Sequence, residues 1–458
     1  MPMNQLNTYI KKSKLYLTEN TVLRYLNFSA LYVAQGIPEG ITYFAIPAWL
    51  AMNGKTPMEI GSFVAVIGIP WSFKILIAPL MDRYTILAMG RKRPWIILGQ
   101  MGLILSFLSF IFIKDPINNL SGLMICGFFI SFFGAFQDVA TDGMAIDVVP
   151  IDEQARANGI MWGSKTVGTA LSLMIGTTLI NTVGFSTAIA SLSVAVGLII
   201  MVPLFFRERP GEKLMPWTKG AASPDSIKNQ LDNWKQIFKN LFKVVPLSSS
   251  IVMGISVLII GLMFGMMDTI LPIFTIQELD WTNTTYSEIY ASSSIIGGFL
   301  GLFIGGALVD FFGKRKMASI YLIFLVVAIG SFAILPQFWH EGSLIYLFIV
   351  TYYVGYTFLN IAVFAICMQL CWKTVAATHF TLFMALCNLG RAWGAGLLGP
   401  MKEKMEWSQM FLSIALIPLT MLILIQFINF IKHKNSIEGF IKEEEKEHLM
   451  NLSSINSN

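Results

Sequence analysis

Charged residues, cysteines and histidines are all scarce in this chain of 458 residues. Asp, Glu, Lys and Arg make up 13% of it, and there are four cysteines and four histidines. So few charges cannot cover the surface of a water-soluble protein of this length with polar groups. We expect no disulfide framework, no metal site and no cofactor, because all four cysteines fall within apolar stretches: Cys126, Cys367, Cys371 and Cys387.

Patterns of known catalytic sites are also lacking. The chain has no His-Glu-x-x-His and no Gly-x-Ser-x-Gly sequence. The segment Gly159 to Thr166 resembles a phosphate-binding P-loop, but Ser164 occupies the position of the glycine before Lys165, and we expect no strand ahead of it. We therefore predict that the protein is neither an enzyme nor an ATP-driven pump.

Long apolar stretches dominate what is present. The chain is 55% apolar with a mean hydropathy of +0.65, and a helix needs about 20 residues to cross a hydrocarbon core of about 30 Å. The apolar runs are continuous, whereas membrane β-strands alternate. The sequence predicts an all-α integral membrane protein with twelve transmembrane helices at residues 22–51, 59–81, 94–113, 120–146, 158–181, 185–206, 246–277, 286–309, 317–336, 344–370, 376–400 and 408–431.

Lys and Arg are distributed unevenly among the connections. If the N-terminus lies inside the cell, 25 of the 32 lie in internal connections or termini and four in external ones. Internal connections of membrane proteins carry such an excess. We therefore predict a multi-pass cell-membrane protein with both termini cytoplasmic, in the inner membrane if the source is a Gram-negative bacterium. The net charge of +5 then reflects topology and does not indicate a nucleic-acid partner.

One long polar interruption divides the predicted helices six and six. Apolar residues recur at helical spacing between Ser226 and Lys243, which predicts an amphipathic helix on the inner surface. Residues 1–20 lack the apolar core of a signal peptide, so we expect the first span to direct insertion. The predicted parts are an N-terminal six-helix bundle (1–206), a cytoplasmic linker (207–245), a C-terminal six-helix bundle (246–432) and a cytoplasmic tail (433–458).

Similar residues recur in the two halves at nearly constant offsets. Chance glycine matches are common in membrane helices, but agreement across three segments is not, so the pattern indicates duplication. The correspondences are Gly36, Gly40 and Pro47 with Gly261, Gly265 and Pro272 at 225, Asp82 with Asp310 at 228, and Lys165 with Arg391 at 226.

Several short motifs resemble those of the major facilitator superfamily. The Asp-Gly-basic loops at 82–93 and 310–316 are similar to its conserved loop, and Pro150, Glu153 and Arg156 are similar to its second loop signature. Within the superfamily, the chain resembles the branch of AmpG-type muropeptide permeases and acetyl-CoA transporters. That resemblance rests on residues 35–38, 70–74, 78–82, 137–143 and 378–390.

The resemblance implies a fold and a mechanism. Two six-helix bundles would surround a central cavity that opens to each side in turn. In such folds, the first, fourth, seventh and tenth helices line the cavity, while the second, fifth, eighth and eleventh form the interface between halves. The resemblance also implies an organic substrate that carries carboxylates or phosphates, either muropeptide-like or acyl-CoA-like.

Charged residues inside the predicted helices are the most informative single positions, because each costs at least about 2.5 to 3.5 kcal/mol at a helix centre. Lys74 and Asp138 lie at similar depths and could pair, and Asp142, one turn from Asp138, could meet Arg83 or Arg91. Asp138 is either part of a latch that closes the cytoplasmic side or a proton carrier. The set consists of Glu39, Lys74, Asp138, Asp142, Lys165, Asp268 and Arg391.

Glu39 follows Pro38 in a glycine-flanked stretch, where a broken helix could expose binding groups. Lys165 and Arg391 occupy matched positions and would form a clamp for an anion, unless each only neutralises an acidic neighbour in its own bundle. The candidates for substrate or proton binding are Gln35, Glu39, Gln137, Asp138, Asp142, Lys165, Asp268, Asn360, Asn388 and Arg391.

The two basic loops and the second loop signature are candidates for gating. An acidic residue at a helix end with an arginine in reach can form an ion pair in one state and break it in another. Glycines permit the tight turn back to the membrane. The candidates are Lys74, Asp82, Arg83, Gly90, Arg91, Arg93, Glu153, Arg156, Asp310, Gly313, Lys314 and Arg315.

These observations together predict a monomeric secondary transporter, a proton-coupled symporter that moves an anionic organic solute by alternating access. Its expected partners are a small-molecule substrate, protons and the lipid bilayer. The alternatives are an antiporter or exporter of other small molecules, a nontransporting membrane sensor and, as a further class, a membrane-bound enzyme. Uptake into proteoliposomes distinguishes them.

Overall fold

The computed structural model describes residues 15–150, 153–228, 234–372 and 375–442. In this part of the chain the regular structure is helical, apart from one isolated bridge between Tyr16 and Arg207. Ten helical stretches are apolar and long enough to cross a membrane. Two further long stretches, Thr21–Met52 and Ala376–Lys402, carry Glu39 and Arg391. The prediction of twelve long helices is confirmed for the described residues.

Four of the first six spans are built from more than one helical element, and two are single helices. The six spans are α2 (Thr21–Glu39) with η1 (Gly40–Ala45) and α3 (Ile46–Met52), α4 (Pro57–Ser72) with α5 (Lys74–Arg83), α6 (Arg93–Leu108) with η3 (Ser109–Phe112), α7 (Leu120–Val148), α8 (Gln154–Val183), and α9 (Phe185–Ile199) with α10 (Met201–Phe205).

The last six spans follow a polar connection that contains α11 (Pro224–Lys228) and α12 (Trp234–Val244). They are α13 (Ser248–Gln277), α14 (Asn283–Leu300) with η5 (Gly301–Gly305) and α15 (Gly306–Phe312), α16 (Lys314–Ala333), α17 (Gly342–Leu370), α18 (Ala376–Lys402), and α19 (Trp407–Leu424) with η8 (Ile425–Phe427). Short 3-10 turns lie at Leu87–Met89 (η2) and Pro336–Phe338 (η6), and residues 430–442 are helical.

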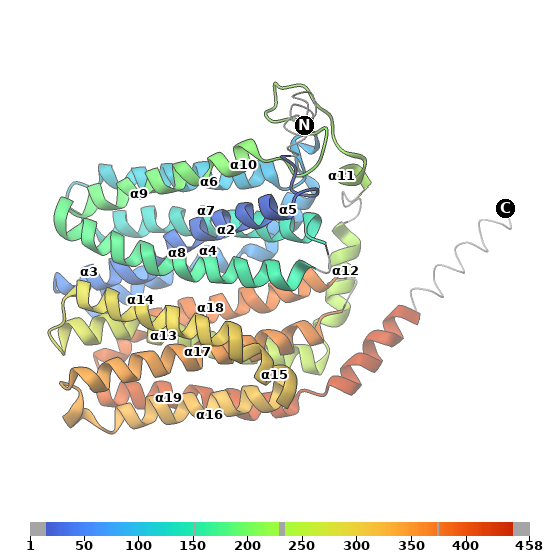
Figure 1. The fold of residues 1–458 in the computed structure, drawn as a ribbon. Coiled ribbons are helices and arrows are strands. Elements are labelled where there is room, and N and C mark those ends of the chain that lie inside the picture. Colours follow the sequence, from blue (N-terminus) through green and yellow to red (C-terminus); the bar gives the residue numbers. More distant parts are fainter. Residues whose placement is uncertain (1–14, 151–152, 229–233, 373–374, 443–458) are drawn as a thin grey trace, which may run out of the picture.

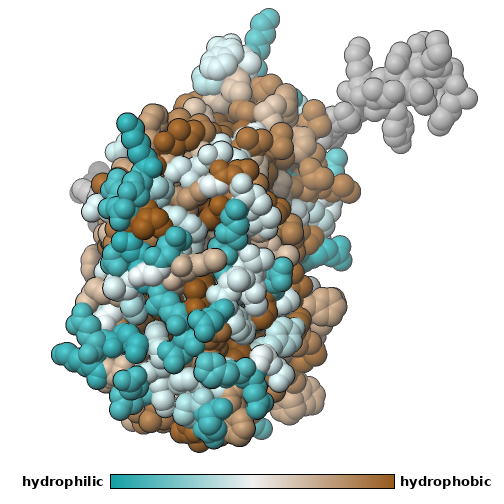
Figure 2. Space-filling view, turned by 90° about the vertical axis from the view of Figure 1, so that its left-hand side faces the viewer, coloured by the Kyte–Doolittle hydropathy of each residue, from teal (hydrophilic) through white to brown (hydrophobic). Residues whose placement is uncertain are grey.

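The spans run side by side, with α2 to α10 stacked on α13 to α19 (Figure 1). The connection with α11 and α12 lies at one end of the helices, which we call the linker end, and the opposite end, with α3 and the start of α14, is the far end. Seen from the far end, polar side chains gather among apolar ones (Figure 2). Many large apolar side chains are exposed along the spans, as expected for a surface that faces lipid.

Glycines let the central helices approach closely. A Cβ on Gly36 of α2 would lie 2.5 Å from the Lys165 carbonyl oxygen of α8, and one on Gly265 of α13 would lie 1.8 Å from the Arg391 carbonyl oxygen of α18. Both distances are shorter than any side chain could tolerate without a shift of the backbone. The matched pairs α2 with α8 and α13 with α18 therefore pack in a similar way, and α4 meets α18 and α8 meets α14 across the two halves.

Hydrogen bonds join the halves at the far end. Gln277 donates to the carbonyl oxygens of Ala51 and Lys55 at 3.0 and 2.8 Å, and the amides of Asn181 and Asn283 bond reciprocally at 3.0 Å. Within the described part of the chain, Asn181 also donates to the Thr284 hydroxyl at 3.1 Å, the hydroxyls of Thr177 and Ser287 bond to each other, and two further hydrogen bonds between the halves lie deeper in the membrane. The far end is therefore held closed.

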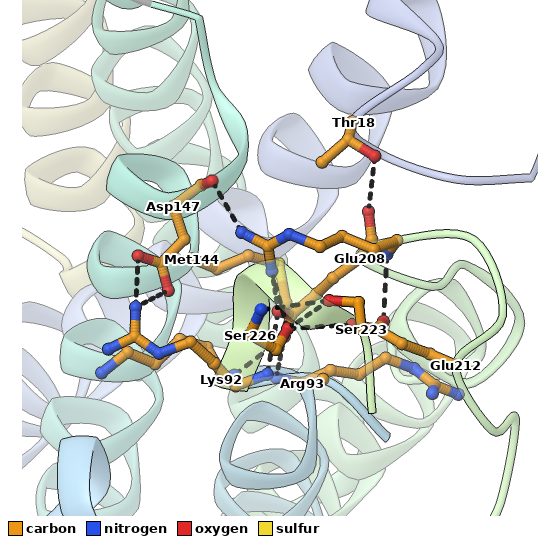
Figure 3. Close-up of polar contacts among 12 residues, drawn as sticks. Thr18, Lys92, Arg93, Met144, Asp147, Glu208, Glu212, Ser223 and Ser226 are labelled. Atoms are coloured by element: carbon orange, nitrogen blue, oxygen red, sulfur yellow. Dashed lines mark hydrogen bonds and ion pairs between the residues drawn. The ribbon is translucent and has the colours of Figure 1, made fainter. Parts of the chain in front are cut away.

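The connection after α10 folds back onto the loop before α6 (Figure 3). The buried carboxylate of Glu208 accepts from the backbone N–H groups of Arg91, Lys92 and Arg93 at 2.9, 2.8 and 2.7 Å. These amides lie at the start of α6, where a helix leaves N–H groups without partners and favours a negative charge. Glu208 therefore caps α6 from a position more than a hundred residues away.

The Arg93 side chain completes this contact. It is fully buried and donates to backbone carbonyl oxygens before α6, at the end of α10 and in the connection. Because the guanidinium donates several hydrogen bonds to backbone carbonyl oxygens, it holds these three segments together. The acceptors are Met89, Pro203, Leu204, Lys213 and Leu214, at 2.5 to 3.3 Å.

Candidate functional site in the middle of the membrane

The first span changes its helical form where the sequence predicts a break. After Pro38 the α-helix continues as the π-helix η1, Gly40–Ala45. Pro38 cannot donate a backbone hydrogen bond, and Thr42 donates its hydroxyl to the Pro38 carbonyl at 2.8 Å. A π-helical turn rotates the side chains that follow it, and such turns are frequent at functional sites. Here it lies next to Glu39.

Glu39 lies between the two matched cations. One of its carboxylate oxygens is 3.1 Å from the Lys165 ammonium, and the other is 3.3 Å from an Arg391 Nη1. Arg391 also donates through Nε to Asp268 at 2.8 Å. These four residues, which we call the central charge cluster, join α8, α2, α18 and α13, and two positive charges balance two negative ones.

The central charge cluster is not sealed in a core. The exposed fraction of the side chain is 17% for Glu39, 16% for Lys165 and 14% for Arg391, whereas it is 3% for Asp268. Asp268 is therefore the inner anchor of Arg391, and the other three reach space that solvent can enter. Lys165 neutralises an acid of its own half, and Arg391 contacts acids of both halves. The predicted neutralisation of acidic neighbours is therefore observed, and the clamp for an anion stays a prediction.

Tyrosines surround the Arg391 side of the cluster. The guanidinium lies 4.1 Å from the ring centroid of Tyr43, close enough for a cation–π interaction. Tyr290 and Tyr353 stack edge to face nearby with centroids 4.8 Å apart. Three buried hydroxyls in this region have no hydrogen-bond partner in the described part of the chain: those of Tyr286, Tyr352 and Tyr353. Unsatisfied hydroxyls and flat rings are groups that a polar organic solute can use.

A second charged group lies closer to the linker end. Lys74 forms an ion pair with Asp138, as the sequence predicts. The Trp71 ring lies between this group and the central charge cluster, with the ammonium groups of Lys74 and Lys165 at 4.5 and 5.6 Å from its centroid. Charged side chains therefore continue from the middle of the membrane toward the linker end.

The predicted contact between Asp142 and Arg91 is wrong. Asp142 accepts a hydrogen bond from the Tyr32 hydroxyl, while the Arg91 Nη1 contacts both carboxylate oxygens of Asp147 at 2.7 and 2.8 Å. Asp147 is more than one turn closer to the end of α7, and so it meets the loop first. Tyr32 had no role in the prediction, because phenols are common packing residues in membrane helices.

The other polar candidates differ in their surroundings. Gln35 is buried with both amide atoms unpartnered, and Gln137 donates to the Leu31 carbonyl at 3.1 Å. Asn388 donates weakly to the Trp71 carbonyl at 3.4 Å, and Asn360 bonds within its own helix at 3.0 Å. The Gln35 amide can therefore still form hydrogen bonds with a bound molecule, whereas the Asn360 amide already donates one within its own helix.

The candidate gating residues form separate contacts. Glu153 accepts from Arg24 at 2.7 and 3.1 Å, and this hydrogen bonding lowers the pKa of Glu153. Gly90 and Gly313 have positive φ angles of 109° and 91°, and Arg156 is exposed. The side chain of Asp82 lies outside the described part of the structure.

The loop of the second half differs from the prediction. Arg315 donates to the Ile428 carbonyl and lies over the Phe430 ring, and no ion pair joins it to the exposed Asp310 in the described part of the chain. Lys314 begins α16 and Arg83 ends α5. The first half's loop is thus tied by Asp147 and Glu208, and the second half's by the end of α19.

Comparison with known proteins decides the family. The sequence profile of the Major Facilitator Superfamily matches residues 28–395. The chain belongs to this superfamily. The match covers both halves and reaches past Arg391, so the central charge cluster lies within the shared fold.

Two curated relatives align over most of the chain. The putative transporter AmpG 3 of Rickettsia prowazekii is 22% identical over 430 residues, 89% of this chain and 97% of that relative. The anhydromuropeptide permease of Escherichia coli K12 is 23% identical, over 83% of this chain and 74% of the permease. The resemblance to AmpG-type permeases predicted from the motifs is confirmed.

Solved structures share the fold. The nucleoside transporter NupG superposes with a TM-score of 0.66 at 12% identity, over 88% of this chain and 98% of that structure. The human organic anion transporter MFSD10 gives a TM-score of 0.61 at 12% identity, over 88% of this chain and 98% of that structure. The protein is therefore a membrane transporter of the superfamily that moves an organic solute, and its homologues are permeases and not enzymes.

Proposed function

We propose that the protein is a proton-coupled symporter for an anionic organic solute, and that a proton bound to Glu39 frees the two cations that the solute then contacts. The observation that carries this proposal is the position of Glu39 between Lys165 and Arg391. Both cations are satisfied by Glu39 in this structure, so an anionic substrate must displace its carboxylate.

Charge balance supports the coupling. The central charge cluster is neutral as it stands, and an added anion would leave a net negative charge in a medium of low polarity, which is costly. A proton on Glu39 removes that charge and frees one contact on each cation. Substrate anion and proton therefore bind favourably together and unfavourably apart, which is the requirement for symport.

The linker end is the proposed cytoplasmic side. The excess of Lys and Arg in the connections at that end favours this orientation. The hydrogen bonds of Gln277 and Asn181 at the far end then belong to an inward-facing state. The exposed fractions of Glu39, Lys165 and Arg391 are consistent with access from the linker end.

The substrate class follows from the groups around the cluster. Cations for a carboxylate, unpaired tyrosine hydroxyls and aromatic faces suit a molecule that combines an acidic group with sugar rings. Two curated relatives bear the names of AmpG-type permeases, which adds support for an anhydromuropeptide. Acyl-CoA-like anions are the alternative within the same class.

The first experiment identifies the substrate. Thermal unfolding of the purified protein should shift upward with an anhydromuropeptide, and less or not at all with its amidated derivative that lacks free carboxylates. Acetyl-CoA and a nucleoside serve as competing candidates. A shift with the nucleoside alone, or equal shifts with the charged and amidated compounds, contradicts the anionic substrate.

Glu39→Gln tests the coupling. We expect proteoliposomes with this variant to lose accumulation driven by a pH gradient by about tenfold or more, the effect of roughly 1.4 kcal/mol, and to keep exchange of preloaded substrate. Asp268→Asn is the comparison, because Asp268 also pairs with Arg391 but has little exposure. Driven accumulation that is unchanged in Glu39→Gln contradicts the role of Glu39.

A further inference from the structure

A small cavity lies between α13 and α18 near the linker end, far from the central charge cluster. It has a volume of about 220 Å³ and is lined by residues between 245 and 258 and between 379 and 386. His379 lies twelve residues before Arg391 on α18, about 18 Å along the helix. The cavity is therefore a separate feature of the fold.

The cavity is apolar except for two side chains. His379 is fully buried, and neither of its ring nitrogens has a hydrogen-bond partner in the described part of the chain. The Ser250 hydroxyl, 3% exposed in the first turn of α13, has no partner either. Each unpartnered buried polar group costs about 1 to 3 kcal/mol, so the site is built for a molecule that supplies hydrogen bonds.

The cavity wall beside the polar groups faces lipid. Ile251 and Ile255 line it and are each 47% exposed on a helix that spans the membrane. Leu386 and the ring of Phe383, which lies 4.7 Å from the His379 ring, cover the inner side. An aliphatic chain can therefore enter from the bilayer without crossing water.

We propose that this cavity binds the head and first carbons of a single-chain aliphatic carboxylic acid. A carboxyl group can accept a hydrogen bond from the Ser250 hydroxyl and form another with the His379 imidazole. The first turn of a 30-residue helix also favours an electron-rich group. The volume is larger than the roughly 150 Å³ of an apolar cavity known to hold benzene, so several methylene groups fit as well.

The proposal is tested with photoreactive decanoic acid, which carries a diazirine on its chain, and the full protein in lipid nanodiscs. We expect cross-links on α13 or α18 peptides that line the cavity, and competition by decanoic acid. Decanol and acetate should compete at least tenfold less well, because one lacks the carboxyl group and the other the chain. Labelling confined to other helices overturns the proposal, and equal competition by decanol or acetate overturns the stated chemistry.

Two variants make the test specific. His379→Phe removes the ring nitrogens at similar volume, and Gly254→Val fills the cavity, because a Cβ there lies 3.2 Å from Leu386 Cδ1. Both should reduce labelling about tenfold or more. His340→Phe, at an exposed histidine outside the cavity lining, and Gly330→Val, where an added Cβ has room, should not.

Thermal unfolding keeps a folding defect separate from a binding defect. A variant counts only if it elutes as a single species and unfolds near the temperature of the parent. If His379→Phe fails this criterion, Gly254→Val and Ser250→Ala supply the result. Undiminished labelling in any correctly folded variant of the cavity overturns the proposal.

Discussion

At the scale of single residues, Arg391 decides how the halves meet in the middle of the membrane. Its Nε contacts Asp268, its Nη1 contacts Glu39, and its face covers the Tyr43 ring. A guanidinium offers several donors in one plane, whereas an ammonium is a point charge on a flexible stem. Lys165, in the matched position, contacts only Glu39 among the acids of the cluster.

This difference predicts that the two cations tolerate exchange unequally. Arg391→Lys should lower transport of the proposed anionic substrate by about tenfold or more, because all donors of an ammonium sit on one nitrogen and cannot reproduce the contacts that Nε makes with Asp268 and Nη1 makes with Glu39. The matched variant Lys165→Arg keeps its single contact and should retain most of the activity. Initial uptake rates in proteoliposomes at equal protein amounts measure both. Equal losses in the two variants would contradict the bridging role of Arg391.

At the scale of elements, residues 207–228 of the connection between the halves form a structured cap on α6. Glu208 binds the start of α6, and Glu212 accepts from the Arg209 backbone N–H at 3.0 Å and the Ser226 hydroxyl at 3.3 Å (Figure 3). Burial and, second, the Glu208 carboxylate raise the pKa of Glu212 to about 7 from its ordinary value of 4.5. The docked connection therefore holds a proton that the undocked one releases.

The sign of the pH effect follows from this raised pKa. Between pH 4.5, the ordinary pKa of Glu212, and about pH 7, its pKa in the docked form, the docked form binds more protons than the undocked form. The stability of the docked form should therefore fall as pH rises through this range, by on the order of 1 to 3 kcal/mol, and should stay constant at higher pH. Hydrogen exchange at the Arg91 to Arg93 amides, corrected for intrinsic rates, should become faster over this range. Glu212→Gln should flatten the profile, and an unchanged profile in this variant would contradict the assignment.

At the scale of the whole molecule, we expect the far-end hydrogen bonds to favour this closed state over one that is open at the far end. Each such bond stabilises by roughly 0.5 to 1.5 kcal/mol net, so several together can shift a two-state equilibrium more than tenfold. Their positions in α3, α8, α13 and α14 mean that any opening at the far end breaks them together. If the proposed transporter opens to each side in turn, these bonds form and break in each cycle.

Removing these bonds should favour opening at the far end. In the double variant Asn181→Ala with Gln277→Ala, spin labels at the exposed Met52 and Met405 should show a longer and broader distance distribution than in the parent. Labels at Tyr84 and Phe312, at the linker end, should move closer. Asn118→Ala, which removes a contact confined to one loop, is the control. Identical distributions in double variant and parent would contradict the role of the far-end hydrogen bonds.

The sequence was sufficient for features that depend on local composition and depth. Apolar length predicted twelve helices with ends close to those observed, and equal depth predicted the pair of Lys74 and Asp138. Offsets between the halves placed Lys165 and Arg391 in matched positions. The first two follow from 1.5 Å of rise per helical residue and from the cost of charge in lipid, and the third follows from aligning the two halves. None of the three requires knowledge of how the helices pack.

The tertiary structure alone decided the partners that depend on rotation and on distant chain segments. Arg391 reaches Asp268 where Gly265 lets α13 approach α18. It reaches Glu39 of the other half where Gly61 and Gly68 of α4 let α18 pack closely against that half. Asp142 meets Tyr32 because α2 turns that face toward α7. The cap formed by Glu208 and the cavity around His379 join residues whose neighbours in sequence give no sign of them. Side-chain contacts between helices depend on their relative rotation, which hydropathy and spacing within one helix do not determine.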